Sequence, residues 1–340
     1  MVGFDGLVVP DALKRLVARD LVAGVVLFGR NIESDSQLFA LARELASLFA
    51  DADAARAEPR GAPIFAVDQE GGAVQRVRPP AIAAVPRVQP MRDAVQALEG
   101  DEGALEALGH AMGQGLRAFG FNVDFAPVLD VDTNPANPII GARAFGTTPE
   151  RVIATALPFA RGLERAGVAW CGKHFPGHGD TDLDSHLALP KLGHDRARLD
   201  AVELAPFRAA VAAGASMLMS AHVVFEALDA ALPATLSARV IPEVLRRDLG
   251  YDQVVVSDDL EMAAIRDHYD VATIARGLAA ADVDLALVCR DLDFAEALAL
   301  ALLPSAAADR RITRLRRGLS PLVTGPIPPF PSALAAALMP

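Results

Sequence analysis

Cysteine is scarce in this sequence, and long apolar runs are missing. Both cysteines among the 340 residues, Cys171 and Cys289, lie inside apolar segments. A disulfide framework is therefore excluded, and each thiol is expected to be a small buried hydrophobic side chain. No apolar run approaches the roughly 18 residues that cross a bilayer, and residues 1–20 lack the basic and apolar regions of a secretion signal. We expect a cytoplasmic protein without membrane association.

Positive charge is also in deficit, because the net charge is −11 at pH 7. A surface of this sign repels nucleic-acid backbones and anionic membranes, so neither is expected as a partner. Hydrophobic residues make up 52% of the chain. That share supplies a large core and argues against a disordered or fibrous protein. The composition therefore predicts a globular protein.

Seven short apolar runs recur along the chain, and each ends in polar or charged residues. Runs of this kind are typical of strands buried on both faces of a parallel sheet. They span residues 23–30, 63–70, 122–130, 169–178, 216–222, 253–259 and 284–290. Stretches with helical spacing lie between them, at residues 36–49, 103–119, 149–166, 199–213, 238–249, 272–281 and 294–303. The chain therefore alternates strand and helix.

This alternation predicts an α/β fold, a (β/α)8 TIM-barrel-like domain formed by residues 1–340. No Gly-x-Gly-x-x-Gly follows the first strand, and polar residues end almost every strand, which favours a closed barrel over an open sheet. One strand is unaccounted for, and residues 4–9 are a candidate. The proline-rich tail from about residue 320 is expected to wrap the surface. Chemistry in such a barrel lies at the carboxyl ends of the strands.

The densest chemical signal is the segment KHFPGHGDTDLDSH at residues 173–186. In an extended backbone Asp184 and His186 point to one face, so the carboxylate can orient the imidazole as an acid/base pair. Taken alone, Asp-x-His is more often a solvated turn. A metal site is the sharper alternative, because His174, His178 and Asp180 add possible ligands. Against it, HExxH and CxxC spacings are absent.

Two further polar clusters end predicted strands. In VVVSDDLEM (residues 254–262) the side chains of Asp258 and Asp259 are expected to point to opposite sides. One would face the barrel mouth as a desolvated nucleophile, and the other would cap the next helix. In DQEGGAVQR (residues 68–76), Asp68 and Arg76 are suited to holding sugar hydroxyls. Helix capping and an exposed turn are the plainer interpretations of these clusters.

Together these segments resemble glycoside hydrolase family 3, and within it the single-domain bacterial β-N-acetylglucosaminidases. The match includes K-H-F-P-G-H-G-x4-D-S-H, DQEGG, NPIIGARAFG at residues 137–146, M-x-A-H-V at 219–223 and S-D-D-L-x-M at 257–262. The resemblance covers residues 2 to 320. Ala73 and Ala142 depart from the residues usual in the family and put local loop packing and affinity in question.

The resemblance implies a retaining, two-step mechanism without a metal or organic cofactor. Asp258 would be the nucleophile and His186 the acid/base, with Asp184 as its partner. The positions that match the family's sites for the terminal N-acetylglucosamine are Asp68, Arg76, Arg143, Lys173 and His174. The implied substrate is a small glycan or muropeptide with a non-reducing terminal β-linked N-acetylglucosamine, released during cell-wall recycling. No protein partner is implied.

Four other functions stay open at this point. A phosphorylase on the same fold is favoured by a histidine acid/base, because a neutral imidazole repels phosphate less than a carboxylate does. A broad β-glucosidase is disfavoured by the KHFPGHG loop. A metal-dependent hydrolase would use the histidine and aspartate loop. A sugar-binding protein without catalysis is disfavoured by the presence of Asp184, His186 and Asp258.

Overall fold

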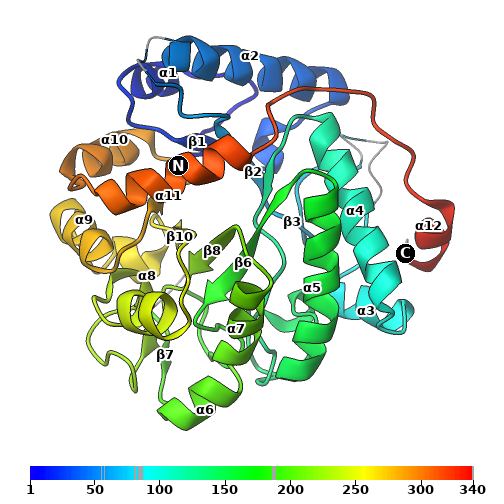
Figure 1. Ribbon diagram of the computed structural model, residues 1–340, viewed down its shortest axis with the longest axis vertical. Helices are drawn as coiled ribbons and strands as arrows, with labels where there is room; N and C mark the ends of the chain where they lie inside the picture. Colours follow the sequence, from blue (N-terminus) through cyan, green and yellow to red (C-terminus); the bar gives the residue numbers. More distant parts are fainter. Residues whose placement is uncertain (55, 57, 80–81, 83–86, 186–188, 339–340) are drawn as a thin grey trace.

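Seven parallel strands form the centre of the fold, and each lies within one of the predicted runs. The computed structural model describes the chain except residues 55, 57, 80–81, 83–86, 186–188 and 339–340. The strands neighbour one another in chain order. They are β1 (Gly24–Leu27), β2 (Ile64–Val67), β5 (Val123–Asp124), β6 (Ala169–Phe175), β8 (Met217–Ser220), β10 (Val254–Asp259) and β11 (Leu285–Leu287). The sheet is curled, and helices surround it (Figure 1).

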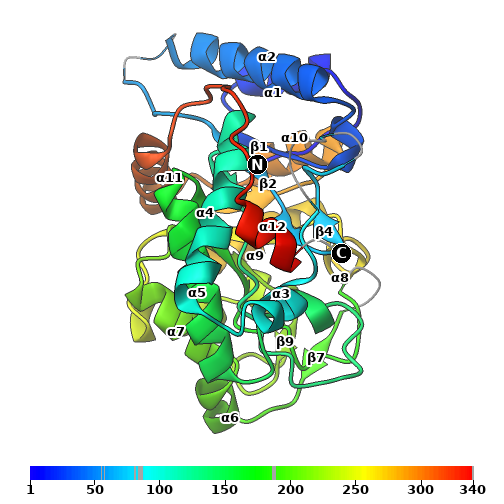
Figure 2. The ribbon, with the colours of Figure 1, turned by 90° about the vertical axis from the view of Figure 1, so that its right-hand side faces the viewer.

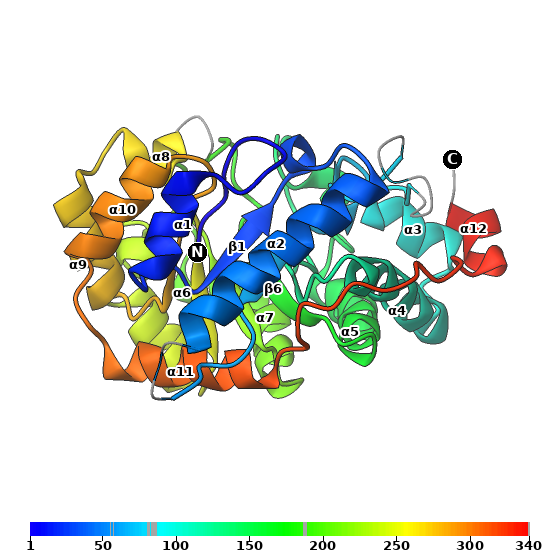
Figure 3. The ribbon, with the colours of Figure 1, turned by 90° about the horizontal axis from the view of Figure 1, so that it is seen from above.

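The first residues of the chain connect the two edges of this sheet. Val2 forms parallel bridges with Val25 of β1 and with Val288, which directly follows β11. Backbone hydrogen bonds of 2.8–3.2 Å hold residues 1–3 on both sides. These residues take the eighth position of the barrel, which the sequence had suggested for residues 4–9. The (β/α)8-like prediction is thereby confirmed, and the chain start lies beside β1 in Figure 3.

The outer layer contains most of the predicted helices. These are α2 (Asp35–Ala54), α4 (Glu102–Ala118), α5 (Pro149–Arg165), α9 (Val271–Ala280), α10 (Leu292–Ala301) and a π-helical segment (Val240–Asp248). Local sequence sets several of their starts. The Asp101 side chain accepts a hydrogen bond from Ala104 N at α4, and Thr148 accepts one from Arg151 N at α5. Both satisfy backbone donors that a helix leaves unpaired in its first turn.

One predicted helix, 199–213, is divided in the structure. It forms α6 (Arg196–Ala201) and α7 (Leu204–Ala212). Pro206 explains the division, because proline has no N–H and is tolerated only in the first turn of a helix. Besides the C-terminal helix, four α-helices in the described part of the chain were not predicted from the sequence. They are α1 (Asp11–Ala18), α3 (Met91–Ala97), α8 (Ala263–Arg266) and α11 (Ala306–Gly318).

The C-terminal tail runs along the outside of the barrel and ends in α12 (Ser332–Leu338). The Arg117 guanidinium donates to the Pro321 carbonyl at 2.8 Å, and Gly325 N donates to the Ala118 carbonyl at 3.0 Å. Beyond these contacts at the end of α4, α12 packs beside α3 (Figure 2). Among the described residues, no helix has both the length and the apolar character to cross a lipid bilayer.

Two small sheets lie in the loops that follow the barrel strands. The first pairs β3 (Gln69–Gly71) with β4 (Val74–Gln75) in antiparallel fashion, directly after β2. The second pairs β7 (Lys191–Leu192) with β9 (Val224–Phe225) in parallel, after β6 and β8 respectively. Both extend the barrel at the carboxyl ends of its strands, where the fold places chemistry.

Candidate active site

A cavity of about 360 Å³ opens at the carboxyl ends of the barrel strands. Six of the eight site residues predicted from the sequence line it: Asp68, Arg76, Arg143, Lys173, His174 and Asp258. Glu70, Phe28, His178, Ser185, Asp259 and Cys289 contribute further wall. The volume falls within the range of roughly 300–1,000 Å³ that is usual for small-molecule sites. Parallel strands from distant parts of the sequence therefore deliver these side chains to one place.

A buried charge network holds one side of this cavity. Lys173 Nζ lies 2.7 Å from Asp68 Oδ1 and 2.6 Å from Glu70 Oε1. Arg143 donates to both oxygens of Glu70, from Nε and Nη2, at 2.8 Å each. This two-bond geometry fixes the direction of the guanidinium. The network joins the ends of β2 and β6 to the loop that carries Arg143.

Burial and neighbouring charge have opposite effects on the pKa of Glu70, and the effect of charge is larger. Burial by itself raises the pKa of a carboxyl, but the Arg143 and Lys173 cations hold the pKa of Glu70 well below its usual range. Burial also lowers the pKa of Lys173, but the Asp68 and Glu70 carboxylates outweigh it and raise that pKa above its usual value. All these groups therefore stay charged at neutral pH. A charged donor such as Lys173, held at a fixed position, is suited to binding sugar hydroxyls.

Asp130 organises the start of the loop after β6. Its Oδ2 lies 2.7 Å from His174 Nδ1, and its Oδ1 accepts the backbone N–H groups of His174 and His178 at 3.1 and 2.7 Å. The pKa of Asp130 is lowered: burial opposes this, but His174 and these hydrogen bonds outweigh it. An ionised Asp130 accepts a hydrogen bond from the Nδ1–H of His174 and so sets the tautomer of that ring.

The sequence interpretation assigned no role to Glu70 or Asp130. Both follow predicted strands, Glu70 inside DQEGG and Asp130 at the end of the run 122–130. A carboxylate that directly follows an apolar run was the available signal. Which of several such carboxylates meet a buried cation or imidazole depends on neighbouring strands, so the signal could not rank them.

Asp258 and Asp259 differ from the expected arrangement. We expected only one of them to face the barrel mouth, but both line the cavity. Asp259 does not cap a helix either. Its Oδ1 accepts hydrogen bonds from Glu261 N at 3.1 Å and Cys289 N at 3.2 Å, while α8 begins only at Ala263. The pairing of β10 with β11 shifts register between Val256 and Asp259, so the strict alternation of side chains is broken at the end of β10.

Arg76 and Phe28 form another wall of the cavity. The Arg76 guanidinium lies 5.8 Å from the centre of the Phe28 ring, and its buried Nε has no hydrogen-bond partner within the described part of the chain. Gln69 Oε1 accepts the Arg76 backbone N–H at 2.9 Å and fixes the turn. A buried donor of this kind is suited to a ligand that supplies an acceptor.

The predicted acid/base pair lies in the loop after β6. Asp184 is half-buried and precedes Ser185, which lines the cavity. His186 lies outside the described residues. The His178 ring holds this loop, because Nδ1 lies 2.7 Å from Thr181 Oγ1 and Nε2 lies 2.9 Å from Ser185 Oγ. Asp184 is thereby fixed one residue away from the cavity wall.

The metal alternative from the sequence is not assembled as expected. It combined His174 and His178 with Asp180 and Asp184, together with His186. In the described residues, Asp180 groups instead with His194 and Glu203. His174 and His178 are engaged by Asp130, Thr181 and Ser185, with their ring centres 5.8 Å apart. The cavity histidines are thus held by hydrogen bonds to protein groups.

Comparison with known proteins relates this chain to one family of enzymes. A family model described as the N-terminal domain of glycosyl hydrolase family 3 matches residues 1–317. A beta-hexosaminidase from Alkalilimnicola ehrlichii is 38% identical over 324 residues, which covers 93% of this chain and 87% of the relative. A family 3 β-N-acetylglucosaminidase from Paenibacillus superposes with a TM-score of 0.89 at 38% identity, over 99% of this chain and 65% of that one. NagZ from Neisseria gonorrhoeae, in complex with N-trifluoroacetyl-D-glucosamine, gives a TM-score of 0.80 at 33% identity, over 94% and 90% of the two chains.

Proposed function

The chain belongs to glycoside hydrolase family 3, and we propose that it is a retaining exo-β-N-acetylglucosaminidase. The observation that carries the proposal is the convergence of six of the predicted site residues on one cavity at the barrel mouth. The Neisseria gonorrhoeae relative was solved with an N-acylated glucosamine. That relative supports a sugar of the same class as the ligand here.

Asp258 is the proposed nucleophile. It lies at the end of β10 on the cavity wall, and its Oδ1 accepts the Asp259 N–H at 2.8 Å. In the first step a carboxylate oxygen bonds to the anomeric carbon while the glycosidic C–O bond breaks, which leaves a glycosyl ester on Asp258. In the second step water attacks the same carbon and releases Asp258. Two inversions give net retention.

His186 is the proposed acid/base, with Asp184 as its partner. The imidazolium gives its proton to the departing oxygen in the first step. The neutral ring then takes a proton from the attacking water in the second step. A group with a pKa near 7 suits both tasks. The Asp184 carboxylate would orient the ring and stabilise its charged form.

The sugar subsite is the network around Lys173. Asp68 and Lys173 offer an acceptor and a donor at the cavity wall, and Arg143 is held in place by Glu70. Arg76 and His174 add donors or acceptors on other walls. These groups suit one sugar ring, which favours exo action. We further propose muropeptide fragments as natural substrates, and cell-wall recycling in the cytoplasm as the setting.

Side-by-side hydrolysis of the p-nitrophenyl β-glycosides of N-acetylglucosamine and of glucose tests the proposal. We expect strong preference for the N-acetyl sugar, with the β-anomer as the first product by NMR. Asp258→Asn is expected to lower kcat by roughly 10³-fold or more, because the nucleophile is lost. Asp267→Asn, at an exposed position beyond α8, is the matched control and is expected to keep wild-type activity.

Several outcomes would contradict the proposal. Initial release of the α-anomer would reject retention, and near-normal turnover by Asp258→Asn would reject the nucleophile. A sugar phosphate formed in phosphate buffer would make the protein a phosphorylase.

Asp184→Asn tests the acid/base pair. We expect kcat to fall less for a substrate with a good leaving group than for one with a poor leaving group, since departure of a good leaving group needs little acid assistance. An equal loss with every leaving group would reject the role of Asp184.

A further inference from the structure

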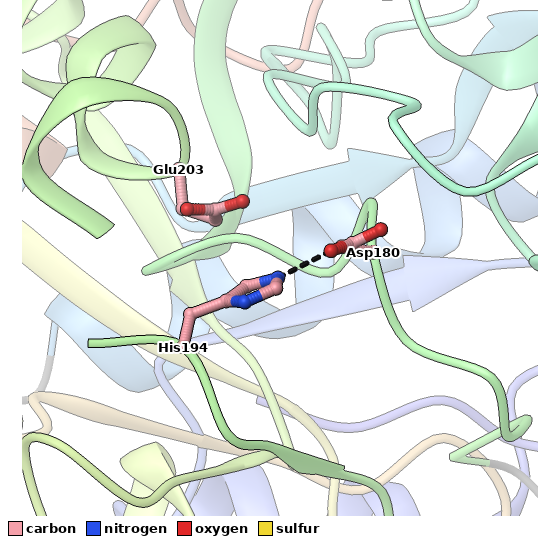
Figure 4. Close-up of side chains that lie close together, drawn as sticks. All are labelled: Asp180, His194 and Glu203. Carbon is pink, nitrogen blue, oxygen red and sulfur yellow. Dashed lines mark hydrogen bonds and ion pairs between the residues drawn. The ribbon is translucent and has the colours of Figure 1, made fainter. Parts of the chain in front are cut away.

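A second cluster of chemically active side chains lies outside the cavity. Asp180 comes from the loop after β6, His194 precedes α6, and Glu203 directly precedes α7. Their potential ligand atoms lie within 4.8 Å of one another. Figure 4 shows the three side chains pointing toward a common space, with an ion pair between His194 Nε2 and Asp180 Oδ2. None of the three lines the cavity of the candidate active site.

Glu203 is the unusual member of this cluster. Its side chain is only 3% exposed, and its Oε1 accepts a hydrogen bond from Arg198 Nη2 at 3.2 Å. Its Oε2 is buried and has no hydrogen-bond partner among the residues that the structure describes. Such an oxygen loses its hydration on folding without a compensating hydrogen bond, which is unfavourable. A buried oxygen without a donor, facing an aspartate and a histidine, indicates that a cation belongs here.

The charges of the cluster also favour a bound cation. Arg198 is the cation that serves both carboxylates, because its Nη2 also lies 3.8 Å from Asp180 Oδ2. With a neutral His194 the four groups carry one net negative charge. A divalent ion would reverse that excess and would engage the Glu203 oxygen that Arg198 does not reach. Asp180 and His194 remain partly exposed, at 18% and 32%, and give an ion a route to the site.

We propose that Asp180, His194 and Glu203 form a zinc site, with the Asp180 carboxylate, His194 Nε2 and Glu203 Oε2 as ligands. One imidazole with two carboxylates suits Zn²⁺, whereas Mg²⁺ and Ca²⁺ favour sites made of oxygen alone. Bonds of about 2.0–2.2 Å place ligand atoms roughly 3.3 Å apart around a tetrahedral ion. The ligand atoms now lie within 4.8 Å of one another, and rotation of the partly exposed Asp180 and His194 side chains would bring them to this shorter spacing. Water completes the fourth position.

The proposed site lies apart from the reaction, because its ligands come from three chain segments and none of them lines the cavity. Asp180 belongs to the loop that also carries His178, whose ring is held by Thr181 and Ser185. Zinc would therefore fix this loop to the starts of α6 and α7. The inference does not depend on the glycosidase reaction, so it is tested by binding and stability.

Zinc binding to the metal-stripped full chain is the experiment, measured by competition with a chromogenic chelator. We expect one equivalent of Zn²⁺ per chain, bound with micromolar or tighter affinity. His194→Ala and Glu203→Gln are each expected to weaken it at least tenfold. Gln keeps the acceptor for Arg198, so Glu203→Gln is expected to fold. His268→Ala, at an exposed position beyond α8, is the matched control and is expected to bind as wild type.

A second readout locates the ion. Crystals soaked in Zn²⁺ are expected to show an anomalous peak between the three side chains, and Zn²⁺ is expected to raise Tm in wild type and in His268→Ala only. Absence of saturable binding would overturn the proposal. Unchanged affinity in both ligand variants would also overturn it, since the zinc would then lie elsewhere, for instance on the cavity imidazoles.

Discussion

At the scale of single residues, the candidate site depends on how each buried carboxyl group is compensated. Glu70 has two cations, and its pKa is lowered below the usual range although burial opposes this. Asp259 has two backbone N–H groups and no cation among the described residues, and burial raises its pKa to about 6. Two carboxyl groups at strand ends therefore differ in charge state in mildly acidic solution.

This difference predicts a pH-dependent stability at Asp259. Its pKa is about 6 in the folded chain against 3.8 as its ordinary value, so the folded state binds the proton more tightly between these pH values. The free energy of unfolding therefore falls as pH rises through this window. Asp259→Asn keeps the accepting oxygen and cannot titrate. Relative to wild type, we expect the variant to gain about 2–3 kcal/mol between pH 4 and pH 7.

Urea unfolding at several pH values between 4 and 7 checks this prediction. The groups facing Asp259 are Asp258 and Glu261, both acidic, and their charge adds to the effect of burial. The exposed Asp267→Asn serves as background, with an unfolding curve expected to follow wild type at each pH. Parallel pH dependences for wild type and Asp259→Asn would contradict the assignment.

At the scale of elements, α4 and α5 are packed unusually closely at glycines. A Cβ on Gly109 would overlap the Phe159 carbonyl, and one on Gly162 would overlap the Glu106 carbonyl. The absence of side chains at these two crossing points lets the two backbones touch. Glycine lowers helix propensity, so both residues are retained in helices for their packing.

Gly162→Ala is expected to destabilise the protein. The added methyl group must push α4 and α5 apart, and overpacking of this kind costs roughly 1–3 kcal/mol, which outweighs the helix propensity of about 1 kcal/mol that alanine gains. Gly103→Ala in the first turn of α4 is the matched control, because its Cβ would meet only Asp101 Oδ1, at 3.4 Å. The effect of each substitution on the free energy of unfolding is measured by urea denaturation. Equal effects of the two substitutions would reject the packing explanation.

At the scale of the whole molecule, the barrel is closed by residues 1–3. Val2 joins β1 to the residue after β11, and Gly3 N donates to the Val288 carbonyl at 2.8 Å. Closure removes the free edges of the sheet. It also positions Cys289, which lines the cavity between this segment and the turn after β10. The first residues of the chain therefore contribute to the geometry of the barrel mouth.

Gly3→Ala tests this closure, because a Cβ on Gly3 would overlap the Cys289 carbonyl. The segment must then move away from β11. We expect Tm to fall by roughly 3–6 °C, as for overpacking elsewhere in a domain of this size. Gly318→Ala at the end of α11 is the control, since no atom lies within 4 Å of its Cβ position. A Tm for Gly3→Ala equal to that of the control would show that the segment adds nothing to barrel stability.

Local patterns in the sequence predict the barrel strands and most outer helices, and the family resemblance adds the matched residues of the cavity wall. A strand buried on both faces requires an apolar run, so the strands can be recognised from the sequence. The polar residues at the ends of parallel strands lie at one rim of the barrel, so the location of the site can be recognised as well. Pro206 was an available signal for the division of the helix predicted at 199–213, but the prediction did not use it. These predictions needed no knowledge of which strand neighbours which.

The remaining features follow from tertiary contacts. Closure through Val2, the pairing of Glu70 with Arg143 and Lys173, the orientation of both Asp258 and Asp259 toward the cavity, and the grouping of Asp180 with His194 and Glu203 all join distant segments. Burial and neighbouring charge fix such contacts and the resulting pKa values, and both arise only when the chain is folded. A local pattern states which side chains end a strand, but not which partner each one meets.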